Sequence, residues 1–189
     1  MYPIFTHYEP DGVGAGYIYN GTKIGQTFIP KFNHTLKQLT LKLKKGSGGS
    51  PGTLTFELFA TSGGLPIGSA LSIGTTNGNL LTTSLVWTDI TMTDYSLLFG
   101  VQYAIVMSGG GVSSIDAAYW GRTAYNTYLD GTEIDYSGSW SISDDGGMMF
   151  KENGLFLPKE SRLKIGNRLP SKVLLADRQP SNIFIADRS

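Results

Sequence analysis

Apolar and polar residues alternate along most of the first 154 residues. Positions 39–44 read LTLKLK, which places three leucines on one face of an extended segment and a threonine and two lysines on the other. Because successive side chains of a strand point to opposite faces, this pattern predicts a half-buried strand. Positions 53–61 (TLTFELFAT) alternate in the same way, whereas positions 100–108 (GVQYAIVMS) are apolar on both faces, as in a central strand.

Shorter extended segments surround these strands. KIGQTFIP (23–30) ends at a proline, LVWTDITM (85–92) alternates, and GGMMFKENG (146–154) supplies a last strand, with glycine-rich turns in between. No window shows sustained helical periodicity. Short strands separated by such turns predict an all-β fold, an antiparallel β-sandwich or jelly roll, and a closed barrel remains the alternative.

Eight stretches of this region carry a resemblance to known modules: GQTFIP (25–30), LKQLTLKLKKG (36–46), GTLTFELFAT (52–61), GLPIGSAL (64–71), VWTDITM (86–92), LLFGVQYAIVM (97–107), YWG (119–121) and GSWSISDDGGMMFKENG (138–154). In this order they resemble jelly-roll modules related to choice-of-anchor and carbohydrate-binding domains, which recur in bacterial surface proteins and phage structural proteins. The resemblance bears more on fold than on function. We expect a jelly-roll sandwich over residues 20–154, preceded by an N-terminal arm at 1–19.

The end of the chain repeats itself every ten residues. The three copies are RLKIGNR (162–168), KVLLADR (172–178) and NIFIADR (182–188), and three copies in register argue against chance. Each copy has a short apolar run, two turn-forming residues and an arginine, and prolines at 170 and 180 interrupt any continuous strand ladder. A ten-residue unit cannot bury its own apolar face, so it must pack on its neighbours, another subunit or a partner.

These copies resemble the decapeptide repeats found at the ends of many tailed-phage virion proteins. LKIGNRLPSKV matches best, whereas the later copies have Ala176 and Ala186 in place of the usual glycine. The resemblance implies that residues 155–189 form an extended β-repeat tail for assembly or attachment. The candidate interface residues are Leu163, Ile165, Arg168, Val173, Leu174, Leu175, Arg178, Ile183, Phe184, Ile185 and Arg188.

Charge separates the two regions. Residues 1–154 carry 8 Lys and Arg against 12 Asp and Glu, a balance of −4, whereas residues 155–189 carry 7 against 3, a balance of +4. This asymmetry suggests that the two regions face different surroundings. The chain contains no cysteine, which excludes disulfides and thiolate metal sites.

The N-terminal sequence, MYPIFTHYEPDG, lacks a basic segment followed by an apolar core, so we expect no secretory signal. No stretch approaches the roughly 18 consecutive apolar residues of a membrane helix. Both features fit a protein that is assembled in the host cytoplasm and located in the virion.

Catalytic motifs are scarce. The only histidines are His7 and His34, and the second lies in FNHTL, where we expect a solvated turn. The chain has no HExxH pair, no Ser–His–Asp arrangement and no phosphate-binding GxxxxGK[ST] loop, so no enzymatic activity is expected.

Carboxylates offer the remaining route to chemistry. Five of them are close in sequence and lie in turn-like segments: Asp130, Glu133, Asp135, Asp144 and Asp145. A glycosidase needs two carboxyl groups at a defined separation, which a sequence does not supply. Clustered oxygens also suit a hard cation, so a structural Ca²⁺ is an alternative, although no EF-hand spacing is present. No other cofactor is expected.

Aromatic residues are concentrated in the same region, interleaved with polar ones. Exposed rings with nearby polar groups suit the apolar faces and hydroxyls of sugars. The candidate glycan-binding residues are Tyr119, Trp120, Arg122, Tyr125, Asn126, Tyr128, Asp130 and Trp140. Filling of the core and contact with another protein are the alternative roles for these rings.

Nucleic-acid binding is not expected, because residues 46–154 carry only two basic residues against ten acidic ones. The leading hypothesis is a non-enzymatic phage virion protein: a fibre, decoration or tail-associated component. Its partners would be other virion proteins or further copies of itself, for which a trimer is one option. The second hypothesis is a carbohydrate-binding module for receptor recognition or adhesion to a cell-surface glycan, and the third is a glycan-active enzyme.

Overall fold

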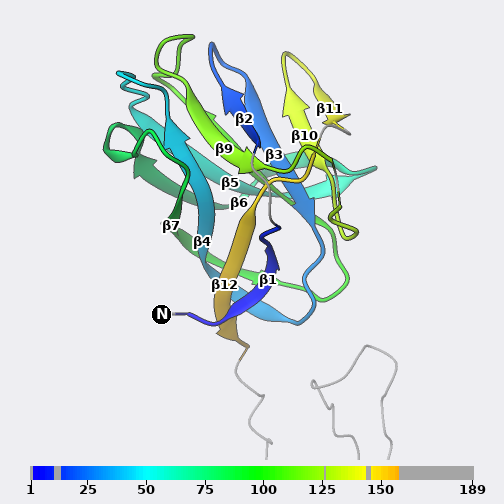
Figure 1. The fold of residues 1–189 in the computed structure, drawn as a ribbon. Helices are drawn as coiled ribbons and strands as arrows, with labels where there is room; N and C mark the ends of the chain where they lie inside the picture. Colours follow the sequence, from blue (N-terminus) through cyan, green and yellow to red (C-terminus); the bar gives the residue numbers. More distant parts are fainter. Residues whose placement is uncertain (1, 11–13, 126, 144–145, 158–189) are drawn as a thin grey trace, which may run out of the picture. The chain divides into compact units, whose positions relative to one another are not determined.

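The computed structural model describes residues 2–10, 14–125, 127–143 and 146–157. These residues form two antiparallel β-sheets, packed face to face (Figure 1). This confirms the predicted all-β antiparallel sandwich. In the described part of the chain, no helix is long and apolar enough to span a membrane. The decapeptide copies and all of their candidate interface residues, from Leu163 to Arg188, lie outside the described residues.

The first sheet, sheet A, is built around its longest strand, β4 (His34–Lys45). One edge of β4 pairs with β7 (Val86–Leu97). The other edge pairs first with β12 (Phe150–Phe156) and then with β9 (Ala118–Arg122). On that second side the outermost strands are β1 (Ile4–Tyr8), which pairs with β12, and β2 (Gly14–Ile18), which pairs with β9.

The second sheet, sheet B, has the strand order β11-β10-β3-β8-β5-β6. Its strands are β3 (Lys23–Phe28), β5 (Thr53–Ser62), β6 (Leu65–Asn77), β8 (Tyr103–Gly109), β10 (Glu133–Tyr136) and β11 (Trp140–Ser143). A short 3₁₀ helix, Gly78–Leu80, lies between β6 and β7. The chain crosses repeatedly from one sheet to the other.

The prediction of a separate N-terminal arm at residues 1–19 is wrong for the residues of this segment that the structure describes. β1 and β2 are strands of sheet A, and Phe5, Tyr8 and Ile18 are buried. The physical reason is that β12 and β9 would otherwise present unpaired backbone groups at the sheet edge. The folded domain therefore begins before residue 20.

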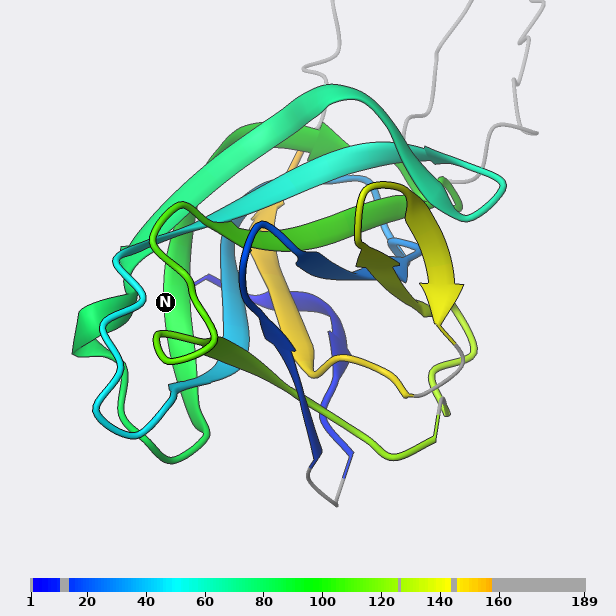
Figure 2. The ribbon, with the colours of Figure 1, turned by 90° about the horizontal axis from the view of Figure 1, so that it is seen from above.

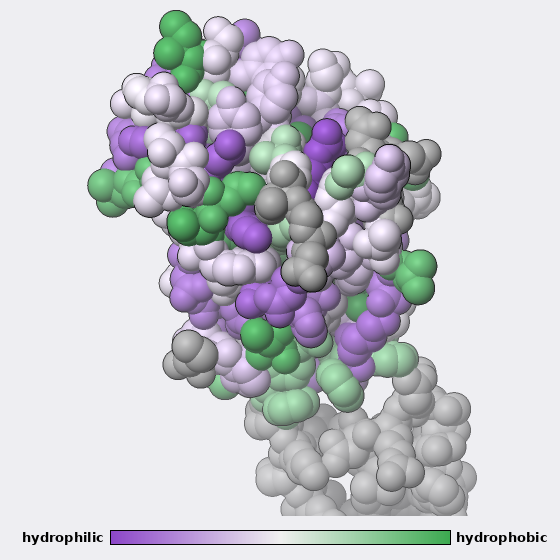
Figure 3. All heavy atoms as spheres, in the orientation of Figure 1, coloured by the Kyte–Doolittle hydropathy of each residue, from purple (hydrophilic) through white to green (hydrophobic). Residues whose placement is uncertain are grey.

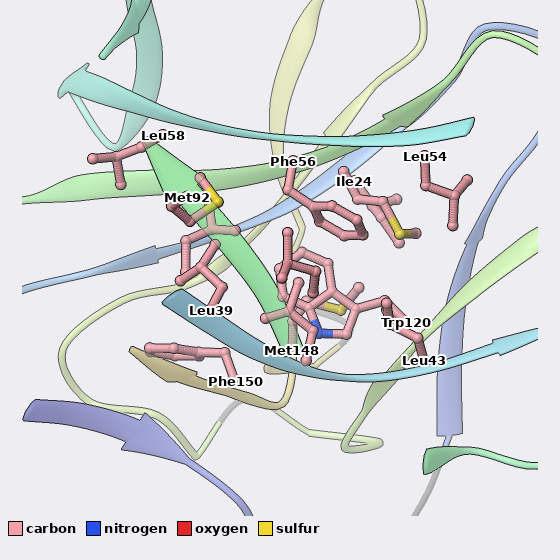
Figure 4. Close-up of a cluster of buried hydrophobic side chains, with 14 of the residues drawn as sticks. Ile24, Leu39, Leu43, Leu54, Phe56, Leu58, Met92, Trp120, Met148 and Phe150 are labelled. Carbon is pink, nitrogen blue, oxygen red and sulfur yellow. The ribbon is translucent and has the colours of Figure 1, made fainter. Parts of the chain in front are cut away.

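The core lies between the sheets, where the predicted alternation holds. Leu39 and Leu43 point from sheet A toward Leu54, Phe56 and Leu58 of sheet B (Figure 4), and all five side chains are fully buried. The expected central strand is β8, which lies between β3 and β5 and buries side chains on both of its faces.

The sandwich is closed on one side by β6 and β7, which pass close to each other where sheet B arches over sheet A (Figure 2). The Thr93 hydroxyl accepts a hydrogen bond from the backbone amide of Ile73 at 2.9 Å. Gly74 allows this approach, since a Cβ there would lie 2.5 Å from the Thr91 carbonyl oxygen. The opposite side, where β2 lies near β3 and β10, is less tightly closed, since a pocket is present between these strands.

His34 does not occupy the solvated turn expected for it. It begins β4 and is fully buried; its Nε2 lies 2.6 Å from Oε1 of Glu152, which is also fully buried. The Nδ1 atom lies 2.8 Å from the Phe32 carbonyl oxygen, and the ring stacks on Phe5 with centroids 3.9 Å apart. Burial raises the pKa of the Glu152 carboxyl, and the hydrogen bond from His34 opposes that rise. The pair is a structural element of the core.

Candidate functional site

Two of the aromatic residues predicted to bind glycans belong to the core. Trp120 is fully buried between the sheets (Figure 4), and its Nε1–H donates to the Met149 carbonyl oxygen at 2.7 Å. Tyr128 is buried against Phe150, with ring centroids 5.5 Å apart, and this burial raises the pKa of its phenol. Neither ring is accessible to a ligand, so the prediction was wrong for both.

The other candidates near Tyr128 do not form one site. Tyr125 lies in the loop after β9 and is 79% exposed. Asp130 forms an ion pair with Lys31, with 2.5 Å between Oδ2 and Nζ. Asn126 lies outside the described residues.

Trp140 belongs to β11 of sheet B, and its side chain lies on the face of that sheet that points away from the core. Its ring packs against Tyr136 with centroids 5.2 Å apart, and the Lys23 ammonium lies 5.7 Å from the centre of the Tyr136 ring. Trp140 also packs against the small apolar cluster around Val106. It is therefore a partly buried residue, on the opposite sheet from Tyr119.

Tyr119 is the predicted residue that has accessible aromatic neighbours. It points outward from β9, directly across from Tyr17 of β2, and the two ring centroids are 5.6 Å apart. Tyr17 is 50% exposed and stacks on Tyr19, which is 37% exposed, at 5.3 Å. Three tyrosine rings thus lie side by side on the outer face of sheet A.

Lysines and a tryptophan extend this row across the sheet. Lys44 of β4 pairs in register with Tyr119, and its ammonium lies 5.0 Å from the centre of that ring. Lys42, two residues earlier on the same face, pairs in register with Trp87 of β7 and lies 5.8 Å from its ring. The Lys151 ammonium approaches the Trp87 ring to 4.5 Å.

We refer to this surface as the aromatic–lysine face, which comprises Tyr17, Tyr19, Lys42, Lys44, Trp87, Tyr119 and Lys151. It crosses β2, β9, β4, β7 and β12, so it depends on strands that are far apart in the sequence. Figure 3 is turned toward the outer side of sheet A and shows hydrophilic side chains gathered over its middle. The face runs over the outer surfaces of paired strands, an arrangement that suits an extended ligand.

A shallow pocket of about 140 Å³ lies beside this face, at the less tightly closed side of the sandwich. The residues that line it are Ala15, Gly16, Tyr17, Ile24, Arg122, Glu133 and Asp135. Arg122, a predicted candidate, donates from Nη1 to Oε1 of the buried Glu133 at 2.8 Å. One guanidinium against two carboxylates disfavours an anion in this pocket.

The carboxylates considered for Ca²⁺ are not gathered around one point in the described residues. Asp130 is paired with Lys31, whereas Glu133 and Asp135 line the pocket. Asp144 and Asp145 lie outside the described residues. Within that described part of the chain, no group of three or more His, Asp or Glu residues is arranged to hold a metal ion.

The side chains of the aromatic–lysine face can make noncovalent contacts with a ligand. Its rings can stack on apolar ligand faces and its ammonium groups can attract or donate hydrogen bonds to oxygen atoms. The buried His34–Glu152 pair has no exposed side-chain surface through which it could exchange a proton with a ligand.

Only Tyr119 of this face was among the residues predicted to bind, and the other six were missed: Tyr17, Tyr19, Lys42, Lys44, Trp87 and Lys151. For Trp87 a signal was available, because alternation with the apolar Ile90 and Met92 places position 87 on the outer face. For the two tyrosines there was none, since their position depends on the pairing of β2 with β9.

Comparison with known proteins does not add a relationship. No protein-family model matches the sequence, and no curated protein matches it.

Proposed function

We propose that this chain is a non-enzymatic virion protein whose β-sandwich binds saccharides through the aromatic–lysine face. The observation that carries the binding role is the row of accessible rings formed by Tyr17, Tyr19 and Tyr119, which continues through lysines to Trp87. The proposal joins the two leading hypotheses from the sequence, display of a module on a particle and recognition of a cell-surface glycan.

Stacking is the physical basis for saccharide binding. The C–H face of a pyranose ring is apolar, and an aromatic plane covers it without leaving a buried polar group unpaired. The rings of Tyr17 and Tyr119 are held side by side by strand pairing, so their ordering costs little conformational entropy when a ligand binds. A flat, open face fits a polysaccharide chain better than a small enclosed ligand.

Assembly in a virion is supported by the sequence of the tail. Three apolar decapeptides at a constant spacing of ten residues follow the domain and resemble repeats of tailed-phage virion proteins. The domain itself has its own core, so it can be displayed while the tail makes contacts elsewhere.

Binding without turnover is the test of this function. The full-length protein should be retained by at least one polysaccharide of a bacterial surface panel, and the bound chain should be recovered at its original length. Tyr119→Ala should weaken that binding. Tyr136→Ala is the matched control, because Tyr136 also lies beneath a lysine but on the opposite sheet.

The alternatives have distinct outcomes. Shortening of the polysaccharide would support the glycan-active enzyme and contradict the proposal. Equal loss of binding in Tyr119→Ala and Tyr136→Ala would show that the face is not the site. Failure to copurify with intact phage particles would contradict the virion role, and it would have no bearing on saccharide binding.

A further inference from the structure

We infer that the aromatic–lysine face selects acidic saccharides, those whose sugar rings carry carboxylate groups, over neutral ones. This inference rests on the proposed saccharide binding and specifies its ligand class. The observation behind it is the placement of two lysines, Lys42 and Lys44, among the rings of the face.

The charge of these two lysines is not neutralised by a carboxylate. In the described residues, Lys37 is paired with Asp94 and Lys151 with Glu9, so these ion pairs add no net charge to sheet A. Neither Lys42 nor Lys44 has an acidic partner within 4.0 Å among the same residues, and the contacts found for their ammonium groups are with ring faces. A cation–π contact leaves the positive charge in place.

The local charge around Lys42 and Lys44 is opposite in sign to the net charge of the domain. Residues 1–154 are acidic overall, yet the strand β4 alone carries four of their eight basic residues: Lys37, Lys42, Lys44 and Lys45. Lys37 is paired with Asp94, Lys45 donates to the Asn79 carbonyl oxygen, and the one carboxylate that pairs in register beside Lys42, that of Asp89, accepts from the Thr40 hydroxyl. Lys42 and Lys44 therefore make their part of the outer side of sheet A locally basic on an acidic domain. An acidic ligand is guided to such a surface and is repelled elsewhere.

The two lysines also fit the geometry of stacking. They are alternate residues on one strand, so their Cα atoms lie about 7 Å apart on the same face. The Lys44 ammonium lies over the Tyr119 ring and the Lys42 ammonium over the Trp87 ring, so a sugar that takes the place of the ammonium on either ring has its substituents next to that ammonium group. A carboxylate there gains a charge-assisted hydrogen bond, which a hydroxyl matches only weakly.

The adjacent pocket does not compete for the same ligand. Its lining combines Arg122 with the carboxylates of Glu133 and Asp135, and Arg122 already donates to Glu133. A ligand carboxylate would meet like charges there. The selection for acidic sugars therefore depends on sheet A and not on the pocket.

The test compares acidic sugars with neutral counterparts of the same shape. Full-length protein is titrated with oligogalacturonate and oligosialate, with the methyl ester of each, and with oligothymidylate as a second kind of polyanion. The acidic sugars should bind more tightly than their esters, and the difference should shrink between 0.05 and 0.5 M salt, because salt screens exposed charges.

The variants assign this preference to the lysines. Lys42→Gln and Lys44→Gln should each weaken binding of the acid form about two- to fivefold and leave binding of the ester nearly unchanged. Lys23→Gln is the matched control, since Lys23 also lies over a tyrosine ring, on sheet B. It should change neither affinity.

Each outcome decides the inference. Equal affinity for acid and ester would overturn it and leave saccharide binding intact, whereas no binding to any sugar of the panel would overturn both. Tighter binding of oligothymidylate than of either acidic sugar would assign the face to nucleic acid instead. Equal effects of Lys44→Gln and Lys23→Gln would show that the preference is not located on the face.

Discussion

Trp120 and Tyr119 are neighbours in β9 that point to opposite sides of sheet A. Substitution of Trp120 should therefore lower the stability of the domain, whereas substitution of Tyr119 should weaken binding of the saccharide. Trp120→Ala removes a fully buried indole and the hydrogen bond from Nε1–H to the Met149 carbonyl oxygen, 2.7 Å long. Loss of a buried tryptophan costs about 3–5 kcal/mol. For a domain of this size that corresponds to a fall in Tm of about 6–20 °C.

The assay is denaturant unfolding followed by tryptophan fluorescence and by circular dichroism, with thermal melting on the same samples. Trp120→Phe is informative beside it, because it keeps most of the apolar volume and leaves the Met149 carbonyl without its donor, a cost of about 1–3 kcal/mol. The two losses should therefore rank in the order Ala, then Phe.

Tyr119→Ala is the control for position in the chain. Its ring lies on the outer side of the sheet, so its loss should lower the free energy of unfolding by about 1 kcal/mol or less while it weakens saccharide binding. If the free energy of unfolding of Trp120→Ala lay within about 1 kcal/mol of that of the unsubstituted protein, and the variant lost saccharide binding instead, the assignment of Trp120 to the core would be refuted.

Three further predictions concern the rest of the domain. Burial raises the pKa of Glu152 above its ordinary value of 4.5, so the folded state holds the carboxyl proton more tightly than the unfolded chain does. As pH rises above about 4.5, the unsubstituted protein should therefore lose stability relative to Glu152→Gln. Urea unfolding of both proteins over a pH series checks this, and a gain in stability with rising pH would contradict it. Gly74→Ala should cost about 1–3 kcal/mol by thermal melting, because its Cβ would lie 2.5 Å from the Thr91 carbonyl oxygen, whereas Gly110→Ala, which meets no atom within 4 Å, should be tolerated. Deletion of 159–189 should leave a cooperatively unfolding domain that no longer enters particles or higher oligomers, and full incorporation of the truncated protein would refute the assembly role of the tail.

Local alternation was sufficient to predict the fold class and the main strands. The leucines at 39, 41 and 43 face the core as expected, and the strand around Ile105 is central. The first two strands were missed because GAGYI (14–18) carries little strand propensity and IFTHY (4–8) is short. Their strand conformation comes from pairing with β9 and β12, which lie more than 100 residues away in the sequence.

The candidate site could be predicted only in part. Tyr119 and Trp120 are adjacent in a strand, so one of the two had to face the core, and alternation alone should have separated them. The position of Tyr17 beside Tyr119 depends on long-range pairing that no local pattern contains. His34 was misplaced for the same reason, since its partner, Glu152, is 118 residues away.

The most direct test of the central claim is to locate the bound saccharide on the protein. Amide and side-chain chemical shifts of the full-length chain are followed by NMR while an acidic oligosaccharide is added. The largest changes should fall on Tyr17, Lys44, Trp87 and Tyr119, with a fitted affinity that weakens in high salt. Changes centred on Tyr136 of sheet B or on Arg122 in the pocket, with the aromatic–lysine face unchanged, would contradict the claim.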